Sequence, residues 1–244
     1  MLEFDPEVTE EEWLQEPPRD AWGMWRSKPR RDRRRVDRKE LLLIVALFRS
    51  VADLLTDPRA LGMAPAVERY ADEPGEPEAA AALDAAGEQV ELAYDAQQPT
   101  RAATHAVAAA RNLVSATHDS AQIIEMAVGA RAAGRAGHER EPDWYECAEY
   151  RAAVAAHGLL MGRLIRDVFG NPFRPVVFSP SWRTGTATAL ARQMYETRDF
   201  SAMPILADAL QDAGCDDTDA LDHCRGSGPH VRGCWVVDLV LGKE

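Results

Sequence analysis

The sequence lacks the features that identify several large classes of protein. It contains no uncharged apolar run of 18 residues, so no segment is predicted to span a membrane, and its acidic start has no signal-peptide core. We therefore expect a cytoplasmic protein. Four cysteines in 244 residues are too few for a disulfide-stapled scaffold. Side chains that favour strands are sparse and rarely alternate, which argues against an extensive β-sheet. The chain has no phosphate-binding glycine loop and no glycine-flanked nucleophile elbow.

What the sequence does contain is helical periodicity. Alanine, the strongest helix former, dominates its middle. Apolar side chains recur at spacings of three and four, which predicts an amphipathic helix over residues 36–56. Further helices are predicted over 77–96, 99–114, 119–130, 142–169, 184–197, 202–213, 217–225 and 229–241. We therefore predict an all-α fold, with an antiparallel helical bundle, a C-terminal group of short helices and an irregular N-terminal arm.

Proline and charge divide the chain into three regions. We expect an arm rich in tryptophan and arginine at 1–35, a central helical bundle at 36–169, and a proline strap with a short-helix subdomain at 170–244. Thr9 and Glu12 fit a capping box, which predicts a short helix inside the arm. Three prolines between residues 170 and 182 favour an extended strap over the bundle.

Positive charge is concentrated beside the arm. The net charge is −12, yet residues 26–39 hold nine of the 28 basic residues and two of the 40 acidic ones. This basic segment either lies on the acidic body and in solvent, or binds nucleic acid or an acidic partner. Three nearby tryptophans require burial, either on the body or on a partner. The residues predicted to bind a partner are Trp13, Trp22, Trp25, Arg30, Arg31, Arg33, Arg34 and Arg35.

Five possible zinc ligands lie close together near the C-terminus. They are Cys215, His223, Cys224, His230 and Cys234. Their spacing matches no common zinc finger, and adjacent helical residues such as 223 and 224 point about 100° apart. Cysteine is also a small core residue. The spacing therefore favours a packed core with hydrogen-bonded histidines, and we expect no cofactor and no metal, with these five residues as the alternative ligands.

Other polar residues admit two interpretations. Cys224 with His230, or Cys147 with His157, would form a nucleophilic dyad only if folding brought them together. The arginines at 225 and 232, near a Gly-Ser-Gly-Pro turn, either bind an anion or pair with nearby aspartates. Asp238 lies in an apolar run, so if it is buried it must be paired with Arg232 or with an arginine from another helix.

Several stretches resemble one protein family. The C-terminal PILADALQDAGCDDTDALDHCRGSGPHVRGCWVVDLVLGKE and the preceding RDVFGNPFRPV are similar to the C-terminus of an alanine-rich, helical bacterial family without an established activity. TEEEWL at 9–14, the segment 37–57 and AVERYAD at 66–72 resemble its N-terminal part. The resemblance implies a shared fold and carries no catalytic residue. The stretch 17–35 is richer in arginine than the family pattern.

These observations favour a non-enzymatic function. We predict an adaptor or scaffold subunit of a bacterial multi-protein system, which binds another protein through its arm and its acidic helical body. The alternative is a nucleic-acid-associated subunit that binds through residues 26–39. We predict no enzyme, because no catalytic constellation is recognised.

Overall fold

The protein is built from helices joined by turns and loops. The computed structural model describes residues 8–15, 21–27, 37–115, 118–138 and 140–243, and no strand occurs in them, which confirms the predicted all-α fold. The α-helices are α1 Glu10–Leu14, α2 Ala21–Ser27, α3 Arg38–Phe48, α4 Met63–Asp72, α5 Pro77–Tyr94, α6 Arg101–Arg111, α7 His118–Arg135, α8 Ala148–Phe169, α9 Gly185–Thr197, α10 Met203–Asp212, α11 Thr218–Arg225 and α12 Trp235–Leu241. Short 3-10 helices are η1 Ala52–Leu54, η2 Pro58–Gly62, η3 Leu113–Ser115, η4 Trp144–Glu146 and η5 Pro180–Trp182. None of the described helices is both long and apolar enough to cross a membrane.

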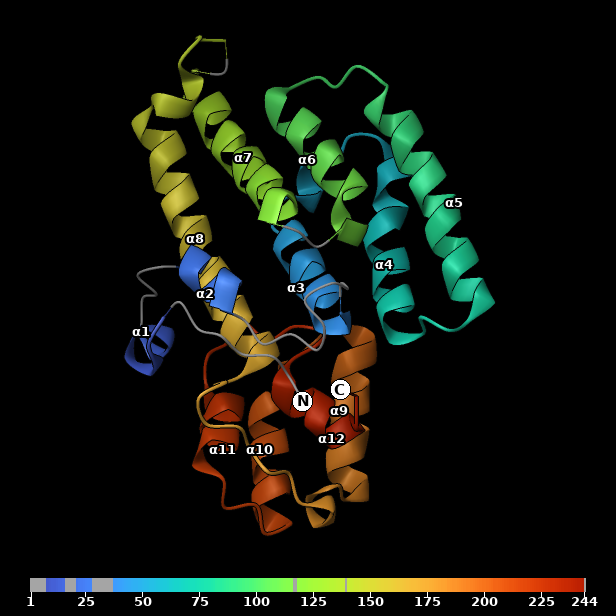
Figure 1. Cartoon of the computed structure of the whole chain (residues 1–244), viewed down its shortest axis with the longest axis vertical. Helices are drawn as coiled ribbons and strands as arrows, with labels where there is room; N and C mark the ends of the chain where they lie inside the picture. Colours follow the sequence, from blue (N-terminus) through green and yellow to red (C-terminus); the bar gives the residue numbers. More distant parts are fainter. Residues whose placement is uncertain (1–7, 16–20, 28–36, 116–117, 139, 244) are drawn as a thin grey trace.

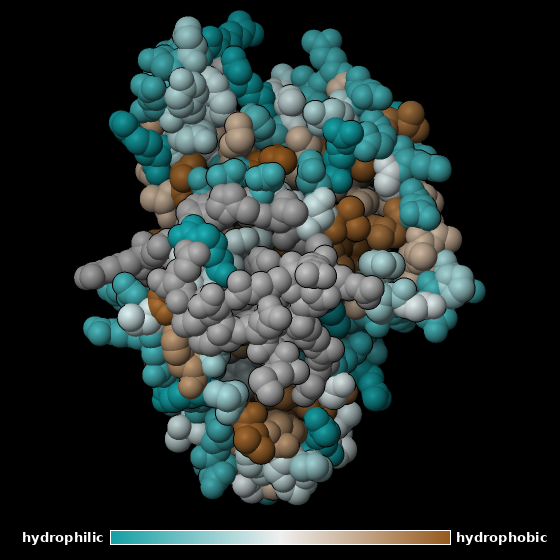
Figure 2. All heavy atoms as spheres, in the orientation of Figure 1, coloured by the Kyte–Doolittle hydropathy of each residue, from teal (hydrophilic) through white to brown (hydrophobic). Residues whose placement is uncertain are grey.

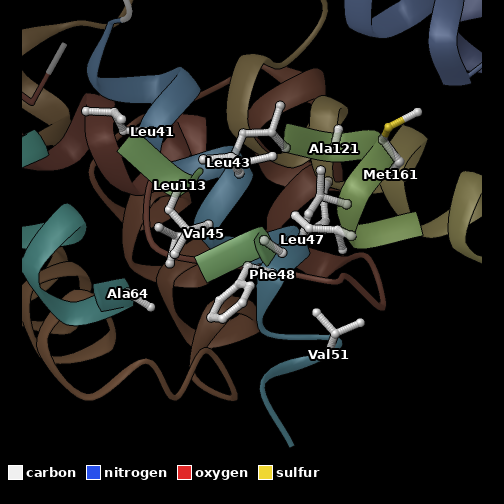
Figure 3. Close-up of a cluster of buried hydrophobic side chains, with 14 of the residues drawn as sticks. Leu41, Leu43, Val45, Leu47, Phe48, Val51, Ala64, Leu113, Ala121 and Met161 are labelled. Carbon is white, nitrogen blue, oxygen red and sulfur yellow. The ribbon is translucent and has the colours of Figure 1, made fainter. Parts of the chain in front are cut away.

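Helix α3 is the centre of the bundle. Its residues from Glu40 to Val45 are all buried, so the helix is enclosed on every side rather than amphipathic. Helices α4, α6, α7 and α8 contact it, and Figure 3 shows Leu43, Leu47 and Phe48 among side chains of the surrounding helices. The helix ends at Phe48, eight residues earlier than predicted. The Ser50 hydroxyl donates to the carbonyl of Leu47, an alternative to helical pairing that favours the end of the helix.

The described residues form two large hydrophobic cores and one small cluster around Trp144. The first lies in the bundle and includes Ile165 and Val168 of α8, while the second lies among α9 to α12 and includes Leu206 and Val236. Figure 1 shows α8 running the length of the bundle and reaching the C-terminal group at its end. The C-terminus of α8 therefore lies at the boundary between the two cores. On the face in Figure 2, hydrophilic residues cover most of the upper end of the molecule, whereas hydrophilic and hydrophobic residues both show at the lower end.

The tryptophans of the arm have an intramolecular role. Trp13 and Trp25 are buried in the bundle core, with 0% and 2% of their surface exposed. The indole Nε1 of Trp13 donates to the carbonyl of Gly170 at 3.0 Å, and its ring packs edge-on against Phe173. Of the two interpretations, packing on the body holds for these two residues, and their assignment as partner-binding residues is corrected. The side chain of Trp22 and all of Arg30, Arg31, Arg33, Arg34 and Arg35 lie outside the described residues.

The helix predicted over 229–241 is shorter than expected. Helix α12 begins only at Trp235, and residues 226–234 form an irregular loop, here named the 226–234 loop. Gly228 and Gly233 have φ angles of 76° and 97°, which interrupt a right-handed helix. The backbone N–H of Val231 donates to a carboxylate of α8 instead of entering a helix. The preceding strap, residues 170–182, contains no strand. It ends in η5, which was not predicted, and Phe173 packs on the bundle whereas Phe178 and Trp182 pack on the C-terminal helices.

A buried ion-pair network joins the C-terminal group to the bundle. Arg38 of α3 pairs with both carboxylate oxygens of Asp238 in α12, at 2.7 and 3.0 Å, and with Asp72 of α4 at 2.8 Å. The hydroxyl of Tyr195 donates to Asp72, and Arg232 pairs with Asp72 at 2.6 Å. The sequence-based requirement that a buried Asp238 be paired is confirmed, with the arginine supplied by another helix.

Candidate metal centre

Four potential metal ligands meet at the end of α8. They are Asp167, His223, His230 and Cys234, here named the four-ligand cluster, and one ligand atom from each lies within 4.8 Å of all the others. Asp167 Oδ1 lies 2.8 Å from His230 Nδ1 and 3.1 Å from His223 Nε2. His223 Nε2 lies 3.2 Å from Cys234 Sγ. The cluster thus combines one carboxylate, two imidazoles and one thiol from three parts of the chain.

The end of α8, which carries Asp167, is held from several sides. Lys39 of α3 donates to the carbonyl of Val168 at 2.7 Å, which satisfies an acceptor of the last helical turn. Gly170 closes the helix with a positive φ of 66°, and a β-carbon there would lie 3.2 Å from the Trp235 ring. Trp13 binds the carbonyl of Gly170. These contacts fix the position of the carboxylate before any ligand binds.

The 226–234 loop brings the remaining groups to this carboxylate. The backbone N–H of Val231 donates to Asp167 Oδ2 at 2.9 Å, which leaves Oδ1 directed at the two histidines. A β-carbon on Gly228 would lie 2.9 Å from the backbone nitrogen of His230, so this turn requires glycine. Cys234 is the N-cap residue of α12, and its N–H donates to the carbonyl of Val231.

For Asp167 and His230, burial and the hydrogen bonds between them shift the pKa in opposite directions. Burial raises the pKa of Asp167, but hydrogen bonds from His223 and His230 outweigh it, so the net pKa is lowered and the carboxylate stays ionised. Burial lowers the pKa of His230, but its hydrogen bond to Asp167 outweighs this and the net pKa is raised. Burial and the charge of Asp167 raise the pKa of the Cys234 thiol. A thiolate at this position therefore requires a neighbouring positive charge.

The separations within the cluster start at 2.8 Å and stay within 4.8 Å, which brackets the spacing of ligand atoms around one metal ion. Tetrahedral zinc, with bonds of about 2.0–2.3 Å, places its ligand atoms about 3.3–3.8 Å apart. Movements of a few tenths of an ångström would bring the observed close contacts into that range. Nε2 of His230 lies 3.4 Å from the carbonyl of Gly226. When Nδ1 binds a metal, Nε2 carries the proton and donates to such a carbonyl, the common outer arrangement of a metal-bound histidine.

A pocket of about 390 Å³ adjoins the four-ligand cluster. Asp167, His223 and His230 form part of its wall, together with Arg163, Arg166 and residues 226–229. The side chains of His223 and His230 are 18% and 8% exposed, whereas Asp167 is 2% exposed. The pocket therefore reaches the histidine side of the cluster.

The structure brings together three of the five sequence-based ligand candidates. His223, His230 and Cys234 belong to the cluster, whereas Cys215 and Cys224 are buried in the second core. As expected for adjacent helical residues, the side chains of His223 and Cys224 belong to different groups, the first to the cluster and the second to the core. The fourth member, Asp167, was not recognised in the sequence. The sequence feature that could have identified it is an acidic residue within a mostly apolar stretch, LIRDVF. The same feature indicated that Asp238 needs a partner if it is buried.

Neither proposed cysteine–histidine dyad is formed. His230 contacts Asp167 and Gly226, while Cys224 is fully buried and burial raises its pKa to about 12. The thiol of Cys147 accepts from the backbone of its own helix, and neither ring nitrogen of His157 has a hydrogen-bond partner. Neither histidine is therefore placed to take a proton from its cysteine, and the two pairs do not constitute nucleophilic sites.

Comparison with known proteins supplies no identity for the chain. No family model matches it, and no curated protein or solved structure matches it. The resemblance drawn from the C-terminal sequence therefore stays an expectation. The geometry of the four-ligand cluster carries the functional conclusion.

Proposed function

We propose that this chain is a zinc-binding protein whose metal is held by Asp167, His223, His230 and Cys234. The observation that carries the proposal is the convergence of four ligand atoms within 4.8 Å, from α8, α11 and the 226–234 loop. This conclusion departs from the sequence-based expectation that the C-terminal cysteines and histidines only pack and that no metal is bound.

The ligand chemistry favours zinc over other common ions. A thiolate and two imidazoles are soft or intermediate donors, which suit zinc and do not suit magnesium or calcium. Four protein ligands complete the tetrahedron that zinc adopts. The ion also supplies the positive charge that a deprotonated Cys234 requires in its buried position, since thiols bound to zinc are ionised.

The metal would connect the two cores. Asp167 is flanked by Ile165 and Val168 of the bundle core, whereas Cys234 and Trp235 belong to the C-terminal core. One ion bound by both would fix the 226–234 loop and the pocket beside it. Because such a site does not exist in the unfolded chain, its binding free energy adds to the stability of the folded state.

Titration of the metal-free protein with zinc tests this proposal. We expect a stoichiometry of one and an affinity that falls at least about 100-fold in Cys234→Ser and His223→Ala, because each loses a direct ligand. Cys147→Ser and His138→Ala are matched controls outside the cluster and should bind as the parent chain does. Unchanged zinc affinity in both cluster variants would contradict the proposal.

A second function remains proposed on the charge distribution. Arg38 and Lys39 make contacts inside the fold, but the arginines at 30, 31, 33, 34 and 35 suit an adaptor that binds an acidic protein partner, with nucleic acid as the alternative ligand. Because Trp13 and Trp25 are buried, deleting the arm would also damage the core. The appropriate variant replaces the five arginines at 30, 31, 33, 34 and 35 with glutamine. Loss of a co-purifying protein supports the adaptor, loss of an electrophoretic shift supports nucleic-acid binding, and no change in either contradicts both.

A further inference from the structure

The pocket beside the four-ligand cluster opens onto one side of the proposed zinc ion. Asp167, His223 and His230 line it, whereas the fourth ligand, Cys234, is fully buried and is not among the lining residues. Its volume of about 390 Å³ is in the range of small-molecule sites. The metal would therefore face a space large enough for a small ligand. Zinc with four protein ligands can accept a fifth ligand.

Two arginines line the same pocket. Arg163 and Arg166 are three residues apart on α8, so they lie on one side of the helix, beside Asp167. Nη1 of Arg166 donates to the backbone carbonyl of Trp13 at 2.9 Å, which anchors this side chain to the arm. An arginine fixed in this way needs little further ordering to bind a ligand.

The charges of the site favour a negatively charged ligand. The two charges of the zinc ion are balanced by the carboxylate of Asp167 and the thiolate of Cys234, and metal-bound histidines are neutral. Arg163 and Arg166 are the two arginines among the residues that line the pocket.

We propose that the pocket binds a small molecule through a phosphate or carboxylate group, which lies between the zinc ion and the guanidinium groups of Arg163 and Arg166. This inference rests on the zinc centre proposed above. The planar fork of arginine matches the oxygens of both groups. Residues 226–229, two of which are glycines, form part of the pocket wall.

Cobalt-substituted protein provides the test, because the visible spectrum of bound cobalt reports changes in its ligands. The metal-free chain is loaded with Co²⁺ and titrated separately with inorganic phosphate and with acetate. We expect a saturable spectral change with at least one of them, and the stronger of the two identifies the class of group. Arg163→Gln should weaken that binding at least about tenfold, since a charge-assisted hydrogen bond is lost. Arg192→Gln, on the exposed side of α9, is the matched control and should bind as the parent does.

Three results would count against the inference. A cobalt spectrum unchanged by both phosphate and acetate overturns the anion site and leaves the metal centre standing. Equal affinities in the parent and Arg163→Gln overturn the role of the guanidinium wall. If the chain binds neither cobalt nor zinc, the metal centre itself falls, and the anion site falls with it.

Discussion

His157 shows how one buried side chain can set the acid stability of the bundle. It lies on α8 with 5% of its surface exposed, and neither ring nitrogen has a hydrogen-bond partner. Burial, with a smaller contribution from the charge of Arg131, lowers its pKa from 6.5 to about 4. The unfolded chain therefore takes up this proton at a higher pH than the folded one. Stability is lost as pH falls from 6.5 towards 4.

The parent chain should lose unfolding free energy between pH 7 and pH 4.5, and His157→Gln should lose about 2–3 kcal/mol less. The figure follows from the lowered pKa of His157, since each pKa unit corresponds to about 1.4 kcal/mol. Urea unfolding at both pH values measures the unfolding free energy of the parent and the variant. His138→Gln, a partly exposed histidine beside Glu141, is the control. An equal acid-dependent loss in the parent and His157→Gln would show that His157 does not carry the effect.

Asp238 is the residue on which the ion-pair network depends most directly. It is 1% exposed and pairs with Arg38 through both carboxylate oxygens. Asp238→Asn should lower the unfolding free energy by about 2–3 kcal/mol, since it removes one of the two carboxylates that pair with the Arg38 guanidinium while Asp72 stays paired with it. Asp212→Asn, at an exposed position in α10, should change it by less than about 0.5 kcal/mol. A similarly small loss of unfolding free energy in Asp238→Asn and Asp212→Asn would contradict the structural role of Asp238.

At the scale of the element, α1 is a small helix held by one large side chain. Its capping box at Thr9 and Glu12, foreseen in the sequence, sets where it begins. Trp13 then anchors it in the bundle core. Trp13→Ala should cost about 3–5 kcal/mol of unfolding free energy by chemical denaturation, whereas Leu14→Ala, at a position 42% exposed, should cost less than about 1 kcal/mol. Equal costs would contradict the intramolecular role of the arm.

The elements also show what periodicity predicts and what it misses. The starts and ends of α5, α9, α10 and α11 fall close to the predicted ranges, because prolines, caps and glycines mark them locally. Residues 229–234 of this loop were predicted as helix because Pro229 suits a first helical turn. The contact that decides its conformation, Val231 with Asp167, joins residues 64 positions apart.

The same limit applies to the site. The cysteines and histidines near the C-terminus were visible as a group, but their separation in space was not. Asp167 lies 56 residues before His223 in the sequence, and only the end of α8 brings it to the loop. A metal site assembled from distant elements therefore leaves little local pattern to read.

At the scale of the whole molecule, zinc and the ion-pair network would both fasten the C-terminal group to the bundle. Removing the metal should then loosen this boundary. Treatment with a chelator should lower the thermal midpoint by at least about 8 °C, because a ligand present at 1,000 times its dissociation constant contributes about 4 kcal/mol. Added zinc should restore the midpoint, and Cys234→Ser should show no response to either. A midpoint unaffected by the chelator in the parent chain would contradict this coupling.

The most direct test of the account is the metal content of the native chain. Elemental analysis by mass spectrometry, on protein purified without added metal or chelator, measures it. We expect one zinc per chain in the parent and in Cys147→Ser, and close to none in Cys234→Ser. A parent chain that contains no zinc and binds none when it is supplied, or a Cys234→Ser variant that keeps a full complement, would contradict the central claim.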